Sequence, residues 1–231
     1  MLLRQLFDAE SSTYTYLLAD EVSGEALLID PVLGQLEAYL RLLSELQLTL
    51  THALDTHVHA DHITALGALR DATGCITLIG KESGASCASD ALREGMRITF
   101  GRYALDVWYT PGHTNDSYSF LLEAEGRRHV FSGDTLLIRG TGRTDFQNGD
   151  AGQQYDSLFG RLLTLPGDTL VCPAHDYKGW TLTTIAEECA HNPRLQVADR
   201  AAYIELMGNL NLPSPKLMDV AVPANLACGK G

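Results

Sequence analysis

A dense cluster of histidines and one aspartate constrains the fold of this chain more than any other sequence feature. It is the run Thr56-His57-Val58-His59-Ala60-Asp61-His62, which follows a β-rich segment and precedes a helical pattern. In an extended chain, side chains two residues apart point the same way, so His57 and His59 share a direction. Asp61 and His62 fall at the expected start of the helix. The cluster therefore predicts an α/β fold with a polar pocket at the carboxyl end of a strand, where ligands commonly bind.

Three further polar residues follow apolar strand candidates in the same way. His113, Asp134 and His175 each lie in a loop that comes directly after such a segment. Imidazole and carboxylate groups bind zinc, iron(II) or manganese, and the chain has no pair of nearby cysteines for a structural zinc site. A purely structural interpretation, with Asp61 as a helix N-cap, leaves the three histidines of the cluster unexplained. The pattern indicates a catalytic metal site with open positions.

The order of the predicted elements indicates how the chain is organised. Strands and helices alternate at first, strands follow one another in the middle, and helices dominate the end. The predicted strands are 14–18, 25–30, 50–56, 76–79, 96–100, 103–109, 117–122, 129–132 and 169–172, and the predicted helices are 36–46, 61–70, 153–163, 181–190 and 199–207. These elements suggest one domain over residues 1–231, an α/β two-sheet sandwich with a C-terminal helical and Pro/Asn-rich extension from about residue 181.

Composition narrows the partners and the location of the protein. The chain has 17 Lys and Arg against 29 Asp and Glu, a net charge of −12 that disfavours nucleic acid. No apolar run approaches the roughly 18 to 20 residues of a membrane helix. The five cysteines are an odd number without a C-x-x-C pair, which argues against a disulfide framework and for a reducing compartment. The first residues, MLLRQLFDAE, do not resemble a secretory or organelle leader, so we expect a cytoplasmic protein that binds neither nucleic acid nor membranes.

The polar residues together resemble the metallo-β-lactamase superfamily, whose pattern is HxHxDH followed by Gly-His, Gly-Asp and Ala-His. In this chain the pattern extends from position 57 to position 175. The resemblance implies an αββα sandwich with the metal at one edge of the two sheets. Members with this full ligand set are commonly dinuclear hydrolases, including glyoxalase II, which hydrolyses acylated glutathione. The fold alone does not choose the reaction.

A narrower resemblance covers almost the whole chain. Segments similar to the persulfide dioxygenases are GTGRTDFQ at 140–147, PAHDY at 173–177, NPRL at 192–195, and the tail segments 207–213 and 222–225. This family implies an enzyme with one iron(II) per chain that oxidises glutathione persulfide with O₂ and water to sulfite and glutathione. The iron ligands of the family map onto His57, His113 and Asp134. Two imidazoles and one carboxylate leave adjacent positions open for substrate and oxygen.

The remaining polar residues of the pattern then need another role. We expect His59, Asp61, His62, His175 and Asp176 to surround the iron site without binding the ion, where they fix ligand orientation and tune the metal. Asp176 would orient either an imidazole or its own loop. The alternative is a second metal ion bound by the first four of these residues.

Substrate contacts are expected from basic and amide side chains near the site. Glutathione carries two carboxylates, which arginine and lysine recognise well. The candidates are Arg143, Tyr177, Lys178, Asn209 and Asn211. A salt bridge to Asp145 is an equally good role for Arg143, and capping of the last helix is the alternative for the two asparagines.

Two other functions compete with a persulfide dioxygenase. The first is a zinc-dependent thioester hydrolase of the glyoxalase II type, which metal content and oxygen consumption would distinguish. The second is a metal-bearing interaction module without turnover. The sequence does not specify the oligomeric state, and a homodimer is one arrangement that it allows.

Overall fold

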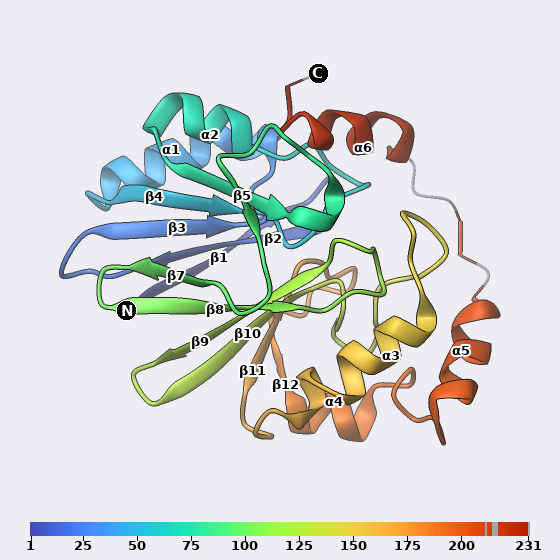
Figure 1. Cartoon of the computed structure of the whole chain (residues 1–231). Helices are drawn as coiled ribbons and strands as arrows, with labels where there is room; N and C mark the ends of the chain where they lie inside the picture. Colours follow the sequence, from blue (N-terminus) through green and yellow to red (C-terminus); the bar gives the residue numbers. More distant parts are fainter. Residues whose placement is uncertain (211, 214–216, 231) are drawn as a thin grey trace.

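Two six-stranded sheets lie face to face in the computed structural model, which describes residues 1–210, 212–213 and 217–230 (Figure 1). In spatial order, the first sheet consists of β1 (Leu2–Asp8), β2 (Thr13–Ala19), β3 (Glu25–Ile29), β4 (Thr49–Leu54), β5 (Ile76–Gly80) and β6 (Asp90–Leu92). In spatial order, the second sheet consists of β12 (Thr183–Thr184), β11 (Leu170–Pro173), β10 (Arg127–Gly133), β9 (Tyr118–Ala124), β8 (Tyr103–Tyr109) and β7 (Arg97–Phe100). Each sheet therefore comes mainly from one half of the chain.

Helices cover the outer faces of the sheets (Figure 1). Those on the first sheet are α1 (Leu36–Glu45), α2 (Leu66–Thr73) and α6 (Met218–Leu226), and those on the second are α3 (Ala151–Phe159), α4 (Ile185–His191) and α5 (Arg200–Gly208). Short 3₁₀ helices are Leu33–Gln35, Lys81–Ser83 and Leu162–Thr164. This layering confirms the predicted αββα sandwich. None of the helices in the described part of the chain combines the length and the apolar character needed to span a membrane.

The apolar pattern of the strands explains the layers. In β2, Tyr14, Tyr16 and Leu18 point into the core between the sheets, while Leu17 and Ala19 point toward the outer helices. A strand that is apolar on both faces is stable only when both faces are covered. The helices on each sheet cover its outer face and the other sheet covers its inner face, so each sheet has two buried faces.

The direction of the strands brings four loops to one edge of the sandwich. β4 runs parallel to both β3 and β5, and β10 runs parallel to β11. β8 has the same direction as β10 because both are antiparallel to β9. The loops that follow β4, β8, β10 and β11 therefore leave the sheets at corresponding ends, which is the position where α/β sheets hold ligands.

Several local predictions are wrong. The helix predicted over 61–70 begins only at Leu66, because Asp61 and His62 lie in the preceding loop, where they bond to each other and to Thr13 instead of starting a helix. The strands β1, β6 and β12 and the helix α6 were not predicted from the sequence. α6 contains Pro223, a residue that usually marks the end of a helix.

The odd number of cysteines argued against a disulfide framework, yet the structure contains a disulfide. Cys87, in the loop before β6, is bonded to Cys228, which follows α6. The two residues are 141 positions apart, and they meet only because the C-terminal helix returns to the first sheet. No local sequence spacing reveals such a pair.

Candidate metal site

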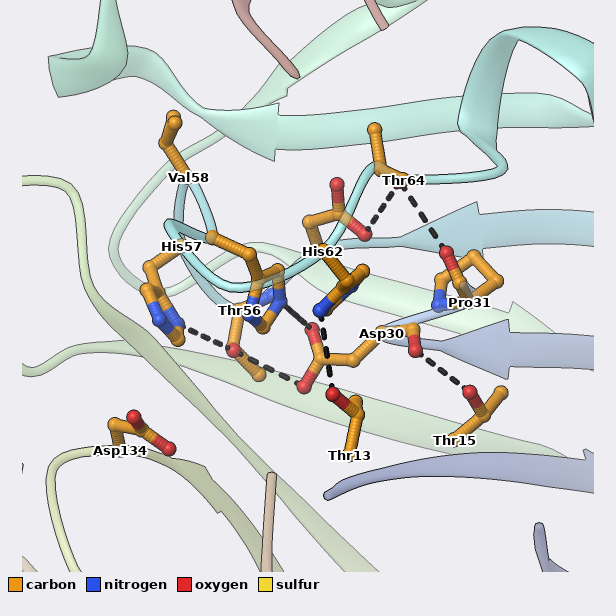
Figure 2. Close-up of polar contacts among 12 residues, drawn as sticks. Thr13, Thr15, Asp30, Pro31, Thr56, His57, Val58, His62, Thr64 and Asp134 are labelled. Atoms are coloured by element: carbon orange, nitrogen blue, oxygen red, sulfur yellow. Dashed lines mark hydrogen bonds and ion pairs between the residues drawn. The ribbon is translucent and has the colours of Figure 1, made fainter. Parts of the chain in front are cut away.

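The histidine-rich loop after β4 is held by the buried carboxylate of Asp30. Thr56 donates to Asp30 through its backbone amide at 2.6 Å and through its hydroxyl at 3.1 Å. The imidazole of His59 bonds to the same carboxylate through Nε2 at 3.1 Å. Figure 2 shows the contacts that link Asp30 to Thr56 and Thr56 to His57. Burial raises the pKa of Asp30 to about 6, although nearby His57 and the hydrogen bonds from Thr56 oppose that rise.

Two more buried side chains hold the same loop from other directions. Asp116, in the loop between β8 and β9, accepts a hydrogen bond from the backbone amide of Val58 at 2.9 Å. Asn225, in α6, bonds to backbone atoms of His59 and His62. Sequence analysis missed Asp30, Asp116 and Asn225 as supports of the site. Asp30 directly follows β3, so the strand-end argument used for His57 would have found it.

His57, His113 and Asp134 form the first group of possible metal ligands. Their ligand atoms lie within 4.8 Å of one another. Thr56 gives its hydroxyl hydrogen to Asp30, so Nδ1–H of His57 donates to the Thr56 oxygen, at 2.9 Å. Nδ1–H of His113 donates to the carbonyl of Arg143 at 2.6 Å. Each imidazole therefore keeps a lone pair on Nε2.

Electrostatics prepares this group for a cation. Burial and the neighbouring histidines hold the pKa of His57 well below its ordinary value, so the imidazole is neutral. Burial alone would raise the pKa of Asp134, but His175, His113 and His57 lower it, and the carboxylate stays ionised. Asp134 follows Gly133, whose φ of +52° turns the chain sharply at the end of β10. Two imidazoles and an ionised carboxylate are a suitable donor set for a divalent metal.

A second group consists of His59, Asp61, His62 and His175, whose ligand atoms also lie within 4.8 Å of one another. His175 bridges two carboxylates, with Nδ1 2.7 Å from Asp134 Oδ1 and Nε2 2.9 Å from Asp61 Oδ2. Burial lowers the pKa of His175, but the two carboxylates outweigh burial and raise it well above its ordinary value. His175 therefore joins the two groups in a carboxylate–imidazolium–carboxylate arrangement.

The second group also has two ring nitrogens that no other group in the described part of the chain uses. Nδ1 of His59 and Nε2 of His62 are buried and have no hydrogen-bond partner among the described residues. An unpaired buried nitrogen is costly unless water or an ion satisfies it. The first group thus fits one divalent ion on its donor set, and the second group has atoms that could hold another ion or a water.

A cavity of about 790 Å³ opens above the first group of ligands. Of the predicted substrate residues, Arg143, Tyr177 and Lys178 line it. Asn209 instead caps the end of α5 by donating to the carbonyl of Glu205 at 2.9 Å. Asn211 lies outside the described residues. Cavities of this size bind small-molecule ligands.

The loop after β11 is shaped by Asp176. Its Oδ2 atom accepts hydrogen bonds from the backbone amides of Lys178 at 2.8 Å and Trp180 at 2.7 Å. Of the two roles expected for Asp176, the structure shows the one in which it orders its own loop. Tyr177 is placed by this turn with its ring parallel to that of His175, at a centroid distance of 6.2 Å.

The positive charges of the cavity differ in their partners. Arg143 forms a two-point salt bridge with Asp145, at 2.6 and 2.7 Å, and also donates to the carbonyl of Pro213. Arg194 also lines the cavity, yet its guanidinium bonds only to Thr141 and makes no salt bridge within the described ranges. Burial lowers the pKa of Arg194. Sequence analysis missed Arg194, although it lies in the segment 192–195 that carried the resemblance.

Comparison with known proteins identifies the family. The model of the metallo-beta-lactamase superfamily matches residues 9–175. The crystal structure of ETHE1 from Myxococcus xanthus has a TM-score of 0.95 and 58% sequence identity, and the match covers 99% of this chain and 100% of that chain. Persulfide dioxygenase ETHE1, mitochondrial, from Mus musculus is 49% identical over 230 residues, which is 99% of this chain and 89% of that protein. This chain belongs to the persulfide dioxygenase family of the metallo-β-lactamase superfamily.

A hydrolase and a di-iron protein that also match this chain are less similar to it than the two ETHE1 proteins are. A hydroxyacylglutathione hydrolase from Neisseria gonorrhoeae is 36% identical over 190 residues, which is 82% of this chain and 74% of that protein. The crystal structure of TTHA1623 in a di-iron-bound form has 29% identity and a TM-score of 0.68, and covers 82% of this chain and 98% of its own. The family resemblance stated from the sequence is confirmed.

Proposed function

We propose that this protein is an iron-dependent persulfide dioxygenase that converts glutathione persulfide, O₂ and water into glutathione and sulfite. The group His57, His113 and Asp134 carries this proposal, because two histidines and one carboxylate on one side of iron(II) leave positions open for substrate and oxygen. Membership of the persulfide dioxygenase family supports the choice of substrate.

Glutathione persulfide, O₂ and water supply all the atoms and electrons that the reaction needs. The sulfur–sulfur bond of the persulfide breaks, the inner sulfur leaves as the thiol of glutathione, and the outer sulfur becomes sulfite. The two sulfurs together lose four electrons, which reduce O₂, and water supplies the third oxygen of sulfite. Iron(II), when bound, supplies the one-electron chemistry that allows O₂ to react with a sulfur anion.

The protein residues prepare the site for this reaction. Nδ1 of His57 and Nδ1 of His113 each donate to an oxygen acceptor, which fixes the tautomer of the ring and leaves Nε2 as the atom that would bind a metal. His175 holds a proton on Nδ1 against Asp134 and so fixes the orientation of that carboxylate. Removing such a partner commonly lowers metal affinity or activity without unfolding the protein.

We assign Arg194 to the binding of a glutathione carboxylate. Arg143 is neutralised by Asp145, whereas Arg194 presents a half-buried guanidinium without an acidic partner in the described segments. A guanidinium binds a carboxylate through two parallel hydrogen bonds. Lys178, on the cavity wall formed by the loop after β11, is the candidate for the second carboxylate.

Replacing Arg194 by alanine should raise KM for glutathione persulfide by about 10- to 100-fold with a smaller change in kcat, since a charged hydrogen bond contributes about 1.5–3 kcal/mol. Steady-state kinetics over a range of persulfide concentrations measures the effect. Arg128→Ala is the matched control, because Arg128 pairs with Glu123 and does not line the cavity. Equal KM values for the two variants would rule out the assignment.

A zinc-dependent glutathione thioester hydrolase is the second candidate function. The unused nitrogens of His59 and His62 favour it, because a second ion in that group would give a dinuclear hydrolytic site. The contact between Asp61 and His175 favours a site with a single ion, because these two side chains already bind each other.

Reconstitution with metal tests the choice between these functions. Metal-free protein loaded under argon with iron(II) should bind close to one ion per chain and then form sulfite from glutathione persulfide when air is admitted. The zinc-loaded protein should form none. Binding of two ions per chain, with hydrolysis of S-lactoylglutathione by the zinc form, would show the hydrolase instead.

A further inference from the structure

Asn225 connects the C-terminal helix α6 to the histidine-rich loop. Its side chain is completely buried, with a relative exposure of 0%. The side-chain amide nitrogen donates to the carbonyl of His59 at 2.8 Å and to the carbonyl of His62 at 2.9 Å, and the side-chain oxygen accepts from the backbone amide of Thr64 at 2.8 Å. One side chain therefore makes three hydrogen bonds to the histidine-rich loop, which contributes His57 to the proposed metal site.

A covalent bond holds the end of this helix. Cys228, two residues after the last residue of α6, is bonded to Cys87. The carbonyl of Cys228 accepts from the backbone amide of Gly67 at 2.9 Å. A Cβ atom at Gly67 would lie 2.6 Å from that carbonyl oxygen, so the close approach needs glycine. The disulfide thus fastens the helix at the point where it touches α2.

The helix has little intrinsic stability of its own. It spans nine residues and contains Pro223, which cannot donate a backbone hydrogen bond. Helices of this length are marginal when isolated, so their stability comes from tertiary contacts. Val220 on its outer side is 61% exposed, which shows that much of α6 faces away from the core. The contacts of Asn225 and the disulfide of Cys228 therefore help to hold α6 in its position.

We propose that α6 holds the histidine-rich loop in place through Asn225, the positioning residue. The Cys87–Cys228 disulfide keeps α6 in position and so makes this contact sensitive to reduction. Reduction of the disulfide frees the end of α6 and weakens the hydrogen bonds from Asn225 to the backbone of His59 and His62. The metal is then released faster. The inference rests on the proposed metal site but not on the oxidation of persulfide, so metal retention can be measured whether or not the chain turns over that substrate.

The reduction step needs an external reductant, for which a water-soluble phosphine is suitable. The phosphine breaks the bond between Cys87 and Cys228, each sulfur receives a proton, and the phosphine becomes its oxide with oxygen from water. Two electrons pass from phosphorus to the disulfide. Cys75, Cys172 and Cys189 are free thiols, which the phosphine does not reduce further.

The test follows the transfer of iron(II) from the loaded protein to a colorimetric chelator under argon, well below the unfolding temperature. The phosphine should accelerate iron release from the wild-type protein by about tenfold or more. Cys87→Ser should release iron at the fast rate with or without the phosphine, which also controls for binding of iron by the reductant. Equal release rates for oxidised and reduced wild-type protein would contradict the proposal that the disulfide slows metal release.

Asn225→Asp tests the positioning role with almost no change of shape. Aspartate still accepts from Thr64 but cannot donate to the two carbonyls, so iron release should be about 10- to 100-fold faster. Val220→Ala is the control on the same helix and should retain iron like the wild type. A lower unfolding temperature with an unchanged release rate would show a merely structural role and contradict the proposal. If Asn225→Asp fails to fold, as judged by circular dichroism, the comparison of oxidised and reduced wild-type protein decides alone.

Discussion

Exchanging Asp134 for asparagine should lower both iron occupancy and persulfide oxidation by at least about 100-fold, because loss of a direct ligand exceeds the loss of a supporting hydrogen bond. The substitution keeps the size of the side chain but removes the only negative charge of the group formed with His57 and His113. It also breaks the charge complementarity with His175. Metal analysis of the purified protein and sulfite formation measure the two effects.

The matched control for this variant is Asp106→Asn. Asp106 lies on β8, and its partly exposed side chain is 3.7 Å from Arg97, away from the cavity. This control should keep its iron and its rate. If Asp134→Asn also kept full iron occupancy and rate, the assignment of Asp134 as a ligand would be wrong.

The second large effect is expected for Asp30→Ala. This substitution leaves the backbone amide of Thr56 and Nε2–H of His59 buried without their acceptor. Since each unsatisfied buried donor costs about 1–3 kcal/mol, the free energy of unfolding should fall by about 3 kcal/mol. The loop that carries His57 should also lose its fixed geometry, and iron occupancy should fall with it. Urea denaturation and metal analysis measure the two changes.

Asp168→Ala provides the comparison for Asp30→Ala. Asp168 is exposed in the turn before β11, so its replacement should change the free energy of unfolding by less than about 0.5 kcal/mol. Similar stabilities for the two variants would mean that the bonds from Thr56 and His59 to Asp30 contribute little, and that another contact holds the loop.

The arrangement of the site follows from a feature that sequence analysis reads well. Apolar runs of β-type identified β4, β8, β10 and β11, and a polar residue directly after such a run lies at the edge of a sheet. This is why the sequence alone was enough to place His113, Asp134 and His175 beside the histidine-rich loop. The αββα sandwich followed from the same order of elements together with the family resemblance.

The supports of the site depend on long-range contacts that no local pattern encodes. Asn225 is 163 residues from His62 along the chain, and Arg194 is 53 residues from the threonine that it binds. The pairing of Cys87 with Cys228 likewise requires the position of α6. Asp61 was misplaced for a related reason, since the attraction of His175, 114 residues away, keeps it in the loop and out of the helix.

Oxygen consumption tests the central claim most directly. The iron(II)-loaded protein, supplied with glutathione persulfide in an oxygen electrode cell, should consume O₂ and form sulfite in equal amounts, and the reaction should stop when argon replaces air. Undiminished product formation under argon, or no oxygen uptake with a fully iron-loaded protein, would contradict the account of a single iron ion held by His57, His113 and Asp134.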